Sequence, residues 1–276
     1  MEIIDAQIHV WQPNSVERPW PSGAVSRQGG AFSVEQALAE MDAAGVSRAI
    51  LVPPFWAGGD SAYALEAARR HPSRFAVMGH FDPDLAGGVE RLHQWRHRSG
   101  MLGIRLLMDT EATSAYAMDK RYAWLWAGCE NARLPLMCCL PGHVAALGPI
   151  ALRHRKLRLI VDHAGRDPDG SKDAAAWKDL DDLLQLARYP NVAVKLSSLP
   201  CFSTAPYPFP VLHGPIERIY DAFGATRLIW GSDATRLTHP YRDNLRLFTE
   251  GLSFLTENDR DWILGGAAAE WCDWSL

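Results

Sequence analysis

Three titratable residues stand where apolar runs of this sequence give way to polar side chains. His9 ends a run near the N-terminus, His163 follows a second run, and Asp233 follows a third. Two imidazoles and a carboxylate can together hold a divalent ion, or they can position a water molecule for attack on an electrophile. Either chemistry requires a fold that brings these three distant positions together.

The apolar runs are the elements that must position these residues, and eight of them recur along the chain. Several are almost continuously hydrophobic, as expected of parallel strands that are buried on both faces. A segment with helical periodicity follows each run, and the first is predicted to start at Ser33, to form a capping box with Gln36 and to stop at Gly45. The runs are Ile3–His9, Arg48–Pro53, Phe75–Phe81, Leu102–Leu107, Leu134–Leu140, Leu157–Asp162, Val192–Leu196 and Leu228–Gly231.

A strand followed by a helix, eight times over, predicts an α/β fold: a (β/α)₈ TIM barrel in which residues 1–276 form a single domain. An open, doubly wound sheet is the competing layout, but no glycine-rich phosphate loop follows the first run. Barrel sites are built at the C-terminal ends of the strands. The loops expected around the site are Trp11–Phe32, Met108–Asp119, Gly165–Asp173 and Ser197–Val211.

Alternation along the first strand predicts that Asp5, Gln7 and His9 share one face, toward the barrel mouth. His163 and Asp233 follow the sixth and eighth strands, so the sequence predicts that all three titratable residues converge at one end. Structural alternatives stay open. His9 and Asp5 could form a polar plug, and Asp233 could cap the segment that follows it.

Four sequence blocks, taken in order, resemble the amidohydrolase superfamily, in the branch called amidohydrolase family 2. The blocks are DAQIHVW, LIVDHAGR, NVAVKLS and LIWGSDATRL, and a closing ILGGAAAEW extends the resemblance to nearly the whole chain. This resemblance also implies a TIM-barrel hydrolase. The branch includes sugar-acid lactonases, a pyrone-dicarboxylate lactonase, a sulfomuconolactonase and non-oxidative decarboxylases.

The resemblance implies a lactonase that hydrolyses a small, anionic cyclic ester. Asp233 would accept a proton from the attacking water and return it to the leaving oxygen. His9 and His163 would polarise the carbonyl group, either through a shared ion or by hydrogen bonds from protonated rings. Two alternatives remain: a metal-dependent, non-oxidative decarboxylase of an aromatic or muconate-type acid, and a barrel that has lost catalysis.

The first strand departs from the family pattern of two histidines separated by one residue, because Gln7 occupies the first of these positions. The resemblance assigns one divalent ion, zinc or manganese, to His9, His163 and Asp233. A glutamine oxygen is a weaker ligand than an imidazole for such an ion, and some lactonases of this branch work without metal. The requirement for a metal therefore stays open, and no organic cofactor is expected.

Five residues are predicted to bind substrate. Arg105, in the fourth strand, and Arg236, after Asp233, are expected to hold a carboxylate because a guanidinium can bind it bidentately. Ion pairs within the protein are the alternative for both arginines. The remaining three are Gln7, Trp11 and Lys195. Lys195 could instead form an ion pair inside the barrel.

Composition limits the partners. A formal net charge of −4 without a long basic run disfavours nucleic acid, and no apolar segment approaches the roughly 20 residues of a membrane span. The five cysteines lack a CxxC pair, and the N-terminal segment lacks signal-peptide features, which favours reduced thiols and a cytoplasmic location. A small-molecule substrate is expected, and a homodimer is left open.

Overall fold

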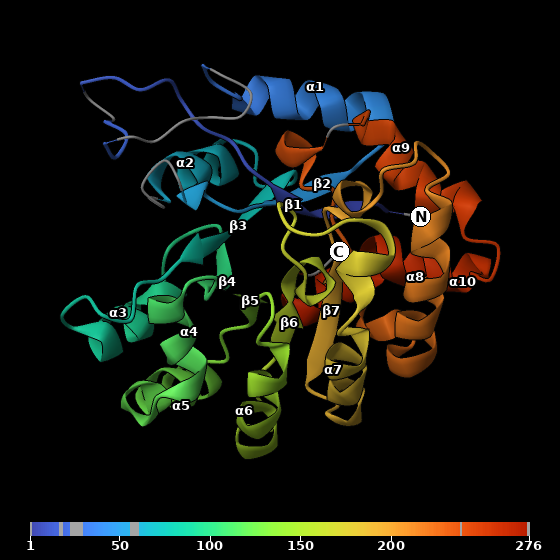
Figure 1. Cartoon of the computed structure of the whole chain (residues 1–276). Coiled ribbons are helices and arrows are strands. Elements are labelled where there is room, and N and C mark those ends of the chain that lie inside the picture. The colour runs from blue at the N-terminus through green and yellow to red at the C-terminus, as the bar shows by residue number, and fades with distance from the viewer. Residues whose placement is uncertain (1, 17–18, 23–29, 56–60, 238, 275–276) are drawn as a thin grey trace.

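Eight parallel strands in chain order form the centre of the molecule (Figure 1). The computed structural model describes residues 2–16, 19–22, 30–55, 61–237 and 239–274. Each strand pairs in parallel with the next one along the chain, which confirms the predicted (β/α)₈ barrel. The strands are β1 (Ile4–Ile8), β2 (Arg48–Leu51), β3 (Phe75–His80), β4 (Met101–Leu107), β5 (Leu136–Cys139), β6 (Leu159–Val161), β7 (Val192–Leu196) and β8 (Leu228–Trp230).

Helices surround the strands (Figure 1). The first helix starts and stops as predicted, since Ser33 and Gln36 form the capping box and Gly45 follows its end with φ of 74°, a backbone conformation that favours glycine. The helices are α1 (Val34–Ala44), α2 (Ala62–Arg70), α3 (Gly88–Trp95), α4 (Glu111–Met118), α5 (Ala123–Asn131), α6 (Leu147–Arg153), α7 (Leu180–Leu184), α8 (Pro210–Phe223), α9 (Tyr241–Arg246), α10 (Glu257–Asp261) and α11 (Ala267–Trp271).

Helix α4 lies in the segment Met108–Asp119, which the sequence analysis treats as a loop, so that prediction is wrong. Thr110 caps the helix and pairs reciprocally with Thr113. Threonine at the third helical position is not the glutamate or glutamine of the usual capping box, and the helix has little amphipathic character to reveal it. The loop around the barrel mouth is therefore shorter than expected.

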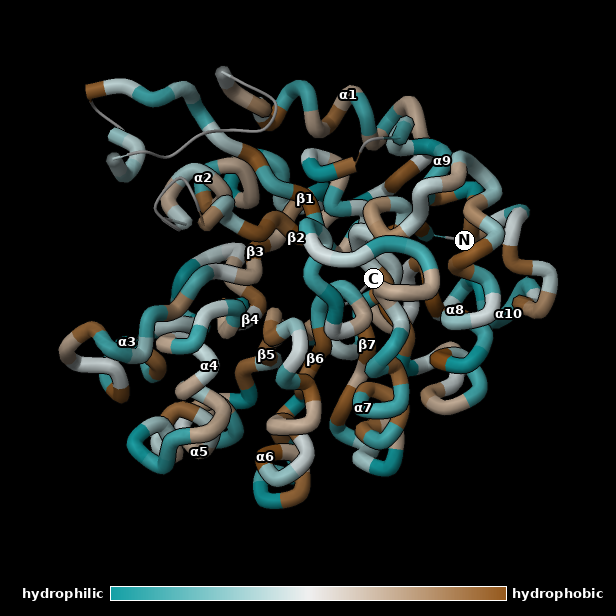
Figure 2. Tube along the Cα trace, in the orientation of Figure 1, coloured by the Kyte–Doolittle hydropathy of each residue, from teal (hydrophilic) through white to brown (hydrophobic). Residues whose placement is uncertain are grey.

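Two apolar layers hold the barrel together. The outer layer lies between the strands and the surrounding helices, and Figure 2 shows hydrophobic colour along β5 and β6 but hydrophilic colour on the outer turns of α5 and α7. The inner layer combines strand residues such as Ile50 and Ile160 with α11. A Cβ atom on Gly265 would lie 2.1 Å from the carbonyl oxygen of Glu2, so the chain leading into α11 packs against the N-terminal entry of β1. The last helix therefore packs at the N-terminal end of the barrel.

Asp5 joins the last strand to the first. Its Oδ1 accepts hydrogen bonds from the backbone N–H groups of Gln7 and Ser232, and its Oδ2 accepts one from the hydroxyl of Tyr241. The pairing of β1 with β2 shifts register between Asp5 and Ile8, which interrupts the simple alternation. The expectation that Asp5 faces the barrel mouth beside Gln7 is therefore wrong, because its carboxylate is bound at the junction of β1 and β8.

Candidate active site

His9, Ser198, His163 and Asp233 form one connected group at the C-terminal ends of β1, β6, β7 and β8. Nε2 of His9 lies 3.1 Å from Oδ1 of Asp233. The hydroxyl of Ser198 lies 2.5 Å from Oδ2 of Asp233 and 3.0 Å from Nδ1 of His163. The predicted convergence of the three titratable residues is therefore present, with Ser198 as the link between His163 and Asp233.

Three of these residues have left-handed backbone conformations directly after their strands. The φ angles are 54° for His163, 58° for Ser198 and 55° for Asp233. Non-glycine residues rarely adopt this conformation, and such strain concentrates at functional sites. The backbone N–H of Asp233 also donates to the carbonyl of Gln7, which fixes the carboxylate beside β1. Ser198 is a site residue that the sequence analysis missed, and its position just beyond β7 is the signal that could have found it.

The amide of Gln7 has a fixed orientation. Lys195 donates from Nζ to Oε1 of Gln7 at 2.5 Å, and because an ammonium can only donate, the amide nitrogen must be the atom that faces His9. That nitrogen lies 3.2 Å from Nε2 of His9, whose other ring nitrogen lies 2.7 Å from the carbonyl oxygen of Val52. The contact with Val52 requires a proton on Nδ1. In the neutral ring, Nε2 therefore accepts from Gln7.

Asp162 pairs with two cations beneath the site. Nζ of Lys195 lies 2.7 Å from Oδ1 of Asp162, and Nε of Arg105 donates to Oδ2 at 2.8 Å. Although burial opposes ionisation, Lys195 and Arg105 hold the pKa of Asp162 well below its usual range. All three side chains are buried. Arg105 and Lys195 therefore form ion pairs within the protein, which was the alternative to substrate binding for both residues.

His163 is neutral at pH 7. Burial lowers its pKa to about 3, and the nearby Arg105 and Lys195 act in the same direction. Nη2 of Arg105 lies 3.3 Å from Nε2 of His163, which makes Nε2 an acceptor and places the ring proton on Nδ1, toward Ser197 and Ser198. Of the two expected ways to polarise a carbonyl, the one that needs a protonated ring does not fit His163.

Asp233 is ionised and fully buried. Burial opposes its ionisation, but the hydrogen bond and charge that a protonated His9 supplies, together with the guanidinium of Arg236, hold its pKa well below the usual range. When the His9 ring is neutral, Oδ1 of Asp233 accepts no hydrogen bond from the residues that the structure describes. A buried carboxylate oxygen without a donor is costly, so this atom is poised to bind a water molecule or another proton donor.

A pocket of about 210 Å³ opens above this group at the C-terminal end of the barrel. Three of the four expected loops reach it, through Trp11, through Asp109 and through the segment 167–169. Its wall contains two arginines and three aspartates among apolar residues. The lining residues are His9, Trp11, Pro54, Phe55, Arg105, Leu107, Asp109, Cys139, Pro141, His163, Asp167, Pro168, Asp169, Thr235 and Arg236.

Three of the predicted site residues lie beneath the pocket wall. Gln7, Lys195 and Asp233 are fully buried and do not line the cavity. Arg236, which does line it, donates from Nη1 to Asp169 at 2.7 Å, and its Nε lies 3.6 Å from Oδ2 of Asp233. His9 and Arg236 therefore stand between Asp233 and the cavity.

The residues of the site do not fit a tightly held cation. Within the described residues, the group close enough to share an ion is Cys139, Asp162 and His163, rather than the predicted set of His9, His163 and Asp233. Burial raises the pKa of Cys139 to about 12, so its thiol stays protonated, and both oxygens of Asp162 already bind cations. Gln7 presents an N–H₂ group to His9 instead of the oxygen that a metal needs.

A parallel barrel with a carboxylate and two imidazoles at its C-terminal mouth defines a class of barrel enzymes built for polar, water-mediated chemistry. The chain belongs to the amidohydrolase family, whose model matches residues 4–272.

The curated relatives agree with this assignment, and a solved structure shares the fold. The chain is 31% identical to an L-fucono-1,5-lactonase of Burkholderia ambifaria over 83% of this chain and 79% of the relative. It is 27% identical to a 4-sulfomuconolactone hydrolase of Hydrogenophaga intermedia over 72% of this chain and 64% of that relative. A zinc-bound amidohydrolase structure from Burkholderia multivorans is 23% identical, with a TM-score of 0.81 and coverage of 99% of both chains.

The remaining expectations concern thiols and membranes. All five cysteines are free and buried. None of the helices within the described residues combines the length and apolar character that crossing a membrane requires. A homodimer and a cytoplasmic location stay predictions.

Proposed function

We propose that this protein is a lactonase that hydrolyses a small cyclic ester at the mouth of its barrel. The observation that carries the proposal is the buried carboxylate of Asp233, whose Oδ1 lies 3.1 Å from Nε2 of His9 and is free to accept a proton from water when that ring is neutral. The two curated relatives described above are named as enzymes that act on lactones, which supports the same reaction class.

Asp233 would act as the general base on the attacking water. A carboxylate with a depressed pKa is a weak base, and efficient general bases have a pKa near the working pH. His9 and Arg236 are two of the groups that lower its pKa, and both line the pocket. A substrate that draws the Arg236 guanidinium toward itself would uncover Asp233 and raise its pKa, so the base would become effective only when substrate is bound.

Arg105 is the donor that we assign to the developing oxyanion. Its guanidinium lines the pocket and stays charged at all working pH values. Asp162 holds Nε in place, and Nη2 faces the neutral ring of His163. Donors fixed in this way stabilise a charge without reorganising during the reaction. His163 would then position both Arg105 and Ser198, and His9 would contact the substrate from the opposite strand end.

The charges of the pocket favour a neutral, hydroxylated lactone over the anionic one that the sequence suggested. Arg105 shares Asp162 with Lys195, and Arg236 pairs with Asp169, so both guanidinium groups already have a carboxylate partner within the protein. Asp109 and Asp167 also line the cavity. Carboxylates accept hydrogen bonds from sugar hydroxyl groups but repel a carboxylate or sulfonate.

The reaction is proposed to proceed without a required metal ion. The alternative decarboxylase reaction needs an ion to anchor the substrate and to stabilise the charge that develops. The orientation of Gln7 and the two cations on Asp162 count against such a site, so the same observations disfavour the decarboxylase.

The test is a pH-indicator assay of the metal-stripped protein against neutral sugar-acid lactones and against muconate-type and pyrone-carboxylate lactones. We expect acid release with the neutral lactones, and a loss of at least 10²-fold in kcat for Asp233→Asn. Asparagine tolerates the left-handed backbone of this position, so the variant should fold. A matched control is Asp181→Asn, which changes an exposed carboxylate of α7 and should keep full activity.

Each outcome has a distinct meaning. Full turnover in Asp233→Asn would remove the proposed mechanism and leave a barrel that works through other residues. Activity that appears only after zinc or manganese is added would overturn the metal-independent proposal. A preference for the anionic lactones would overturn the argument from pocket charge while leaving the lactonase proposal intact.

A further inference from the structure

A second cavity, of about 750 Å³, lies at the opposite end of the barrel from the candidate active site. Two of its lining pairs, Leu134–Pro135 and Leu157–Arg158, directly precede β5 and β6, which places it at the N-terminal ends of these strands. The ends of α5 and α6 supply further lining residues. This cavity shares no lining residue with the pocket above His9.

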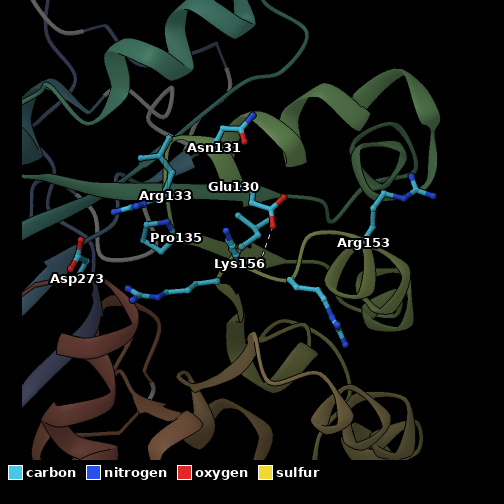
Figure 3. A pocket seen from close by; sticks show the side chains of 11 residues that line it. Glu130, Asn131, Arg133, Pro135, Arg153, Lys156 and Asp273 are labelled. Atoms are coloured by element: carbon cyan, nitrogen blue, oxygen red, sulfur yellow. Dashed lines mark hydrogen bonds between the residues drawn. The ribbon is translucent and has the colours of Figure 1, made fainter.

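Positive charge dominates the lining of this cavity. Five cationic side chains face two acidic ones, although the whole chain has a formal net charge of −4. In Figure 3, Arg133 and Asp273 lie on one side of the cavity and Arg153 lies on the other, with Lys156 and Glu130 between them. The five cations are Arg133, Arg153, Arg155, Lys156 and Arg158.

The two acidic residues are already occupied by other groups. Arg96, which does not line the cavity, donates to Asp273 at 2.7 Å. Glu130 pairs with Nδ1 of His154 at 3.0 Å and accepts the backbone N–H of Lys156.

The five cations have no carboxylate of their own. Within the described residues, none of them forms an ion pair, and the Nη1 of Arg158 donates only to the carbonyl oxygen of Glu270. Glu130 and Asp273 offset part of this charge, since Lys156 lowers the pKa of Glu130, and Arg158 and Arg133 join Arg96 in lowering that of Asp273, but the five cations still outnumber the two acids.

We propose that this cavity binds a small multivalent anion of the oligophosphate type. Guanidinium groups bind phosphate oxygens through paired hydrogen bonds, and a lysine adds a point charge. One orthophosphate cannot span cations that lie on opposite sides of such a cavity, whereas a chain of phosphates can contact several of them. Among the residues that the structure describes, none in the lining is aromatic and could stack on a nucleobase, so the recognised part is the phosphate chain itself.

The direct test is isothermal titration of the full-length protein with tripolyphosphate at constant ionic strength, with sulfate as the comparison anion. We expect tripolyphosphate to bind at one site and at least ten-fold more tightly than sulfate, with an affinity that falls as salt rises. Saturating tripolyphosphate should also raise Tm, because a ligand that binds only the folded state stabilises it.

The variant is Arg133→Gly combined with Lys156→Ala, and we expect at least a ten-fold loss of tripolyphosphate affinity. Arg133 has φ of 53°, which glycine adopts without strain, and neither removed cation leaves an unpaired carboxylate, so the fold should persist. The matched control combines Arg69→Ala and Arg242→Ala, which remove two exposed cations elsewhere, and it should bind as the unmodified protein does.

Three results would overturn the proposal. Equal affinity in the double variant and its control would show that binding is not located in this cavity. Loss of binding in Arg236→Ala would place the anion in the candidate active site instead. Binding of polyglutamate without binding of tripolyphosphate would show that the surface recognises an acidic polypeptide rather than a phosphate chain. None of these outcomes depends on the lactonase activity.

Discussion

Replacing Asp5 with asparagine should change how the stability of this protein depends on pH. Burial raises the pKa of Asp5 to about 6 from its ordinary value of 3.8, even though Ser232, Gln7 and Tyr241 donate hydrogen bonds to it. Because the folded pKa is the higher one, the unfolded chain releases this proton first as pH rises. The stabilising contribution is complete below about pH 3.8 and is lost as pH rises through about 6.

The size of the effect follows from the shift. About two pKa units, at about 1.4 kcal/mol each, correspond to a loss of about 3 kcal/mol in the free energy of unfolding between pH 4 and pH 7. Asparagine can keep the observed contacts of Asp5. Its Oδ1 would accept the two backbone N–H groups, and its Nδ2 would donate to the hydroxyl oxygen of Tyr241. We therefore expect Asp5→Asn to match the unmodified protein near pH 4 and to be about 3 kcal/mol more stable above pH 7.

The measurement is urea unfolding followed by tryptophan fluorescence at several pH values from about 4 to about 7.5, for both proteins. Other titrating groups are shared, so they cancel in the difference between the two free energies of unfolding. Tyr241→Phe is a second variant: it removes a donor that favours ionised Asp5, and it should steepen the loss of stability with pH. A difference between Asp5→Asn and the unmodified protein that stays constant over this range would refute the reasoning.

Three further predictions concern the barrel interior. Ser198→Ala should lower kcat about ten-fold and shift the acidic limb of the pH–rate profile upward, because Asp233 loses a hydrogen bond that stabilises its charge. Lys195→Met should lower the free energy of unfolding by about 3–5 kcal/mol in urea, because Asp162 loses one of its two buried cations. Gly265→Ala should cost about 1–3 kcal/mol and lower Tm, because the new Cβ would meet a backbone carbonyl oxygen at 2.1 Å.

Each of these predictions has an internal control. Ser197→Ala removes a hydroxyl that contacts His163 but has no bond to Asp233, so its pH–rate profile should stay in place; an equal shift in both serine variants would contradict the role given to Ser198. Gly214→Ala lies in α8 with open space around the new Cβ and should leave Tm unchanged or raise it slightly. If Lys195→Met were as stable as the unmodified protein, the Asp162 ion pairs would not be structural.

The barrel and the strand ends that carry the site follow from the order and spacing of residues along the chain. The order of the eight apolar runs follows from periodicity, which is a local property, and the capping residues Ser33, Gln36 and Gly45 act within one helix. A parallel barrel then places the C-terminal ends of all strands at one mouth. For this reason the meeting of His9, His163 and Asp233 could be predicted without knowing any contact between them.

The surroundings of those residues depend on the folded chain. The register shift in β1 takes Asp5 out of the site, and the contact of Gln7 with Lys195 turns its amide oxygen away from His9. The bridging hydroxyl of Ser198 and the basic cavity at the other end of the barrel also arise from segments that come together only in the folded chain. Such contacts join residues that are distant in the sequence. They depend on strand register, on local bulges and on which donor lies within hydrogen-bond distance of a buried acceptor. Periodicity carries none of that information, because it specifies which face of an element is buried but not which polar atom lies opposite.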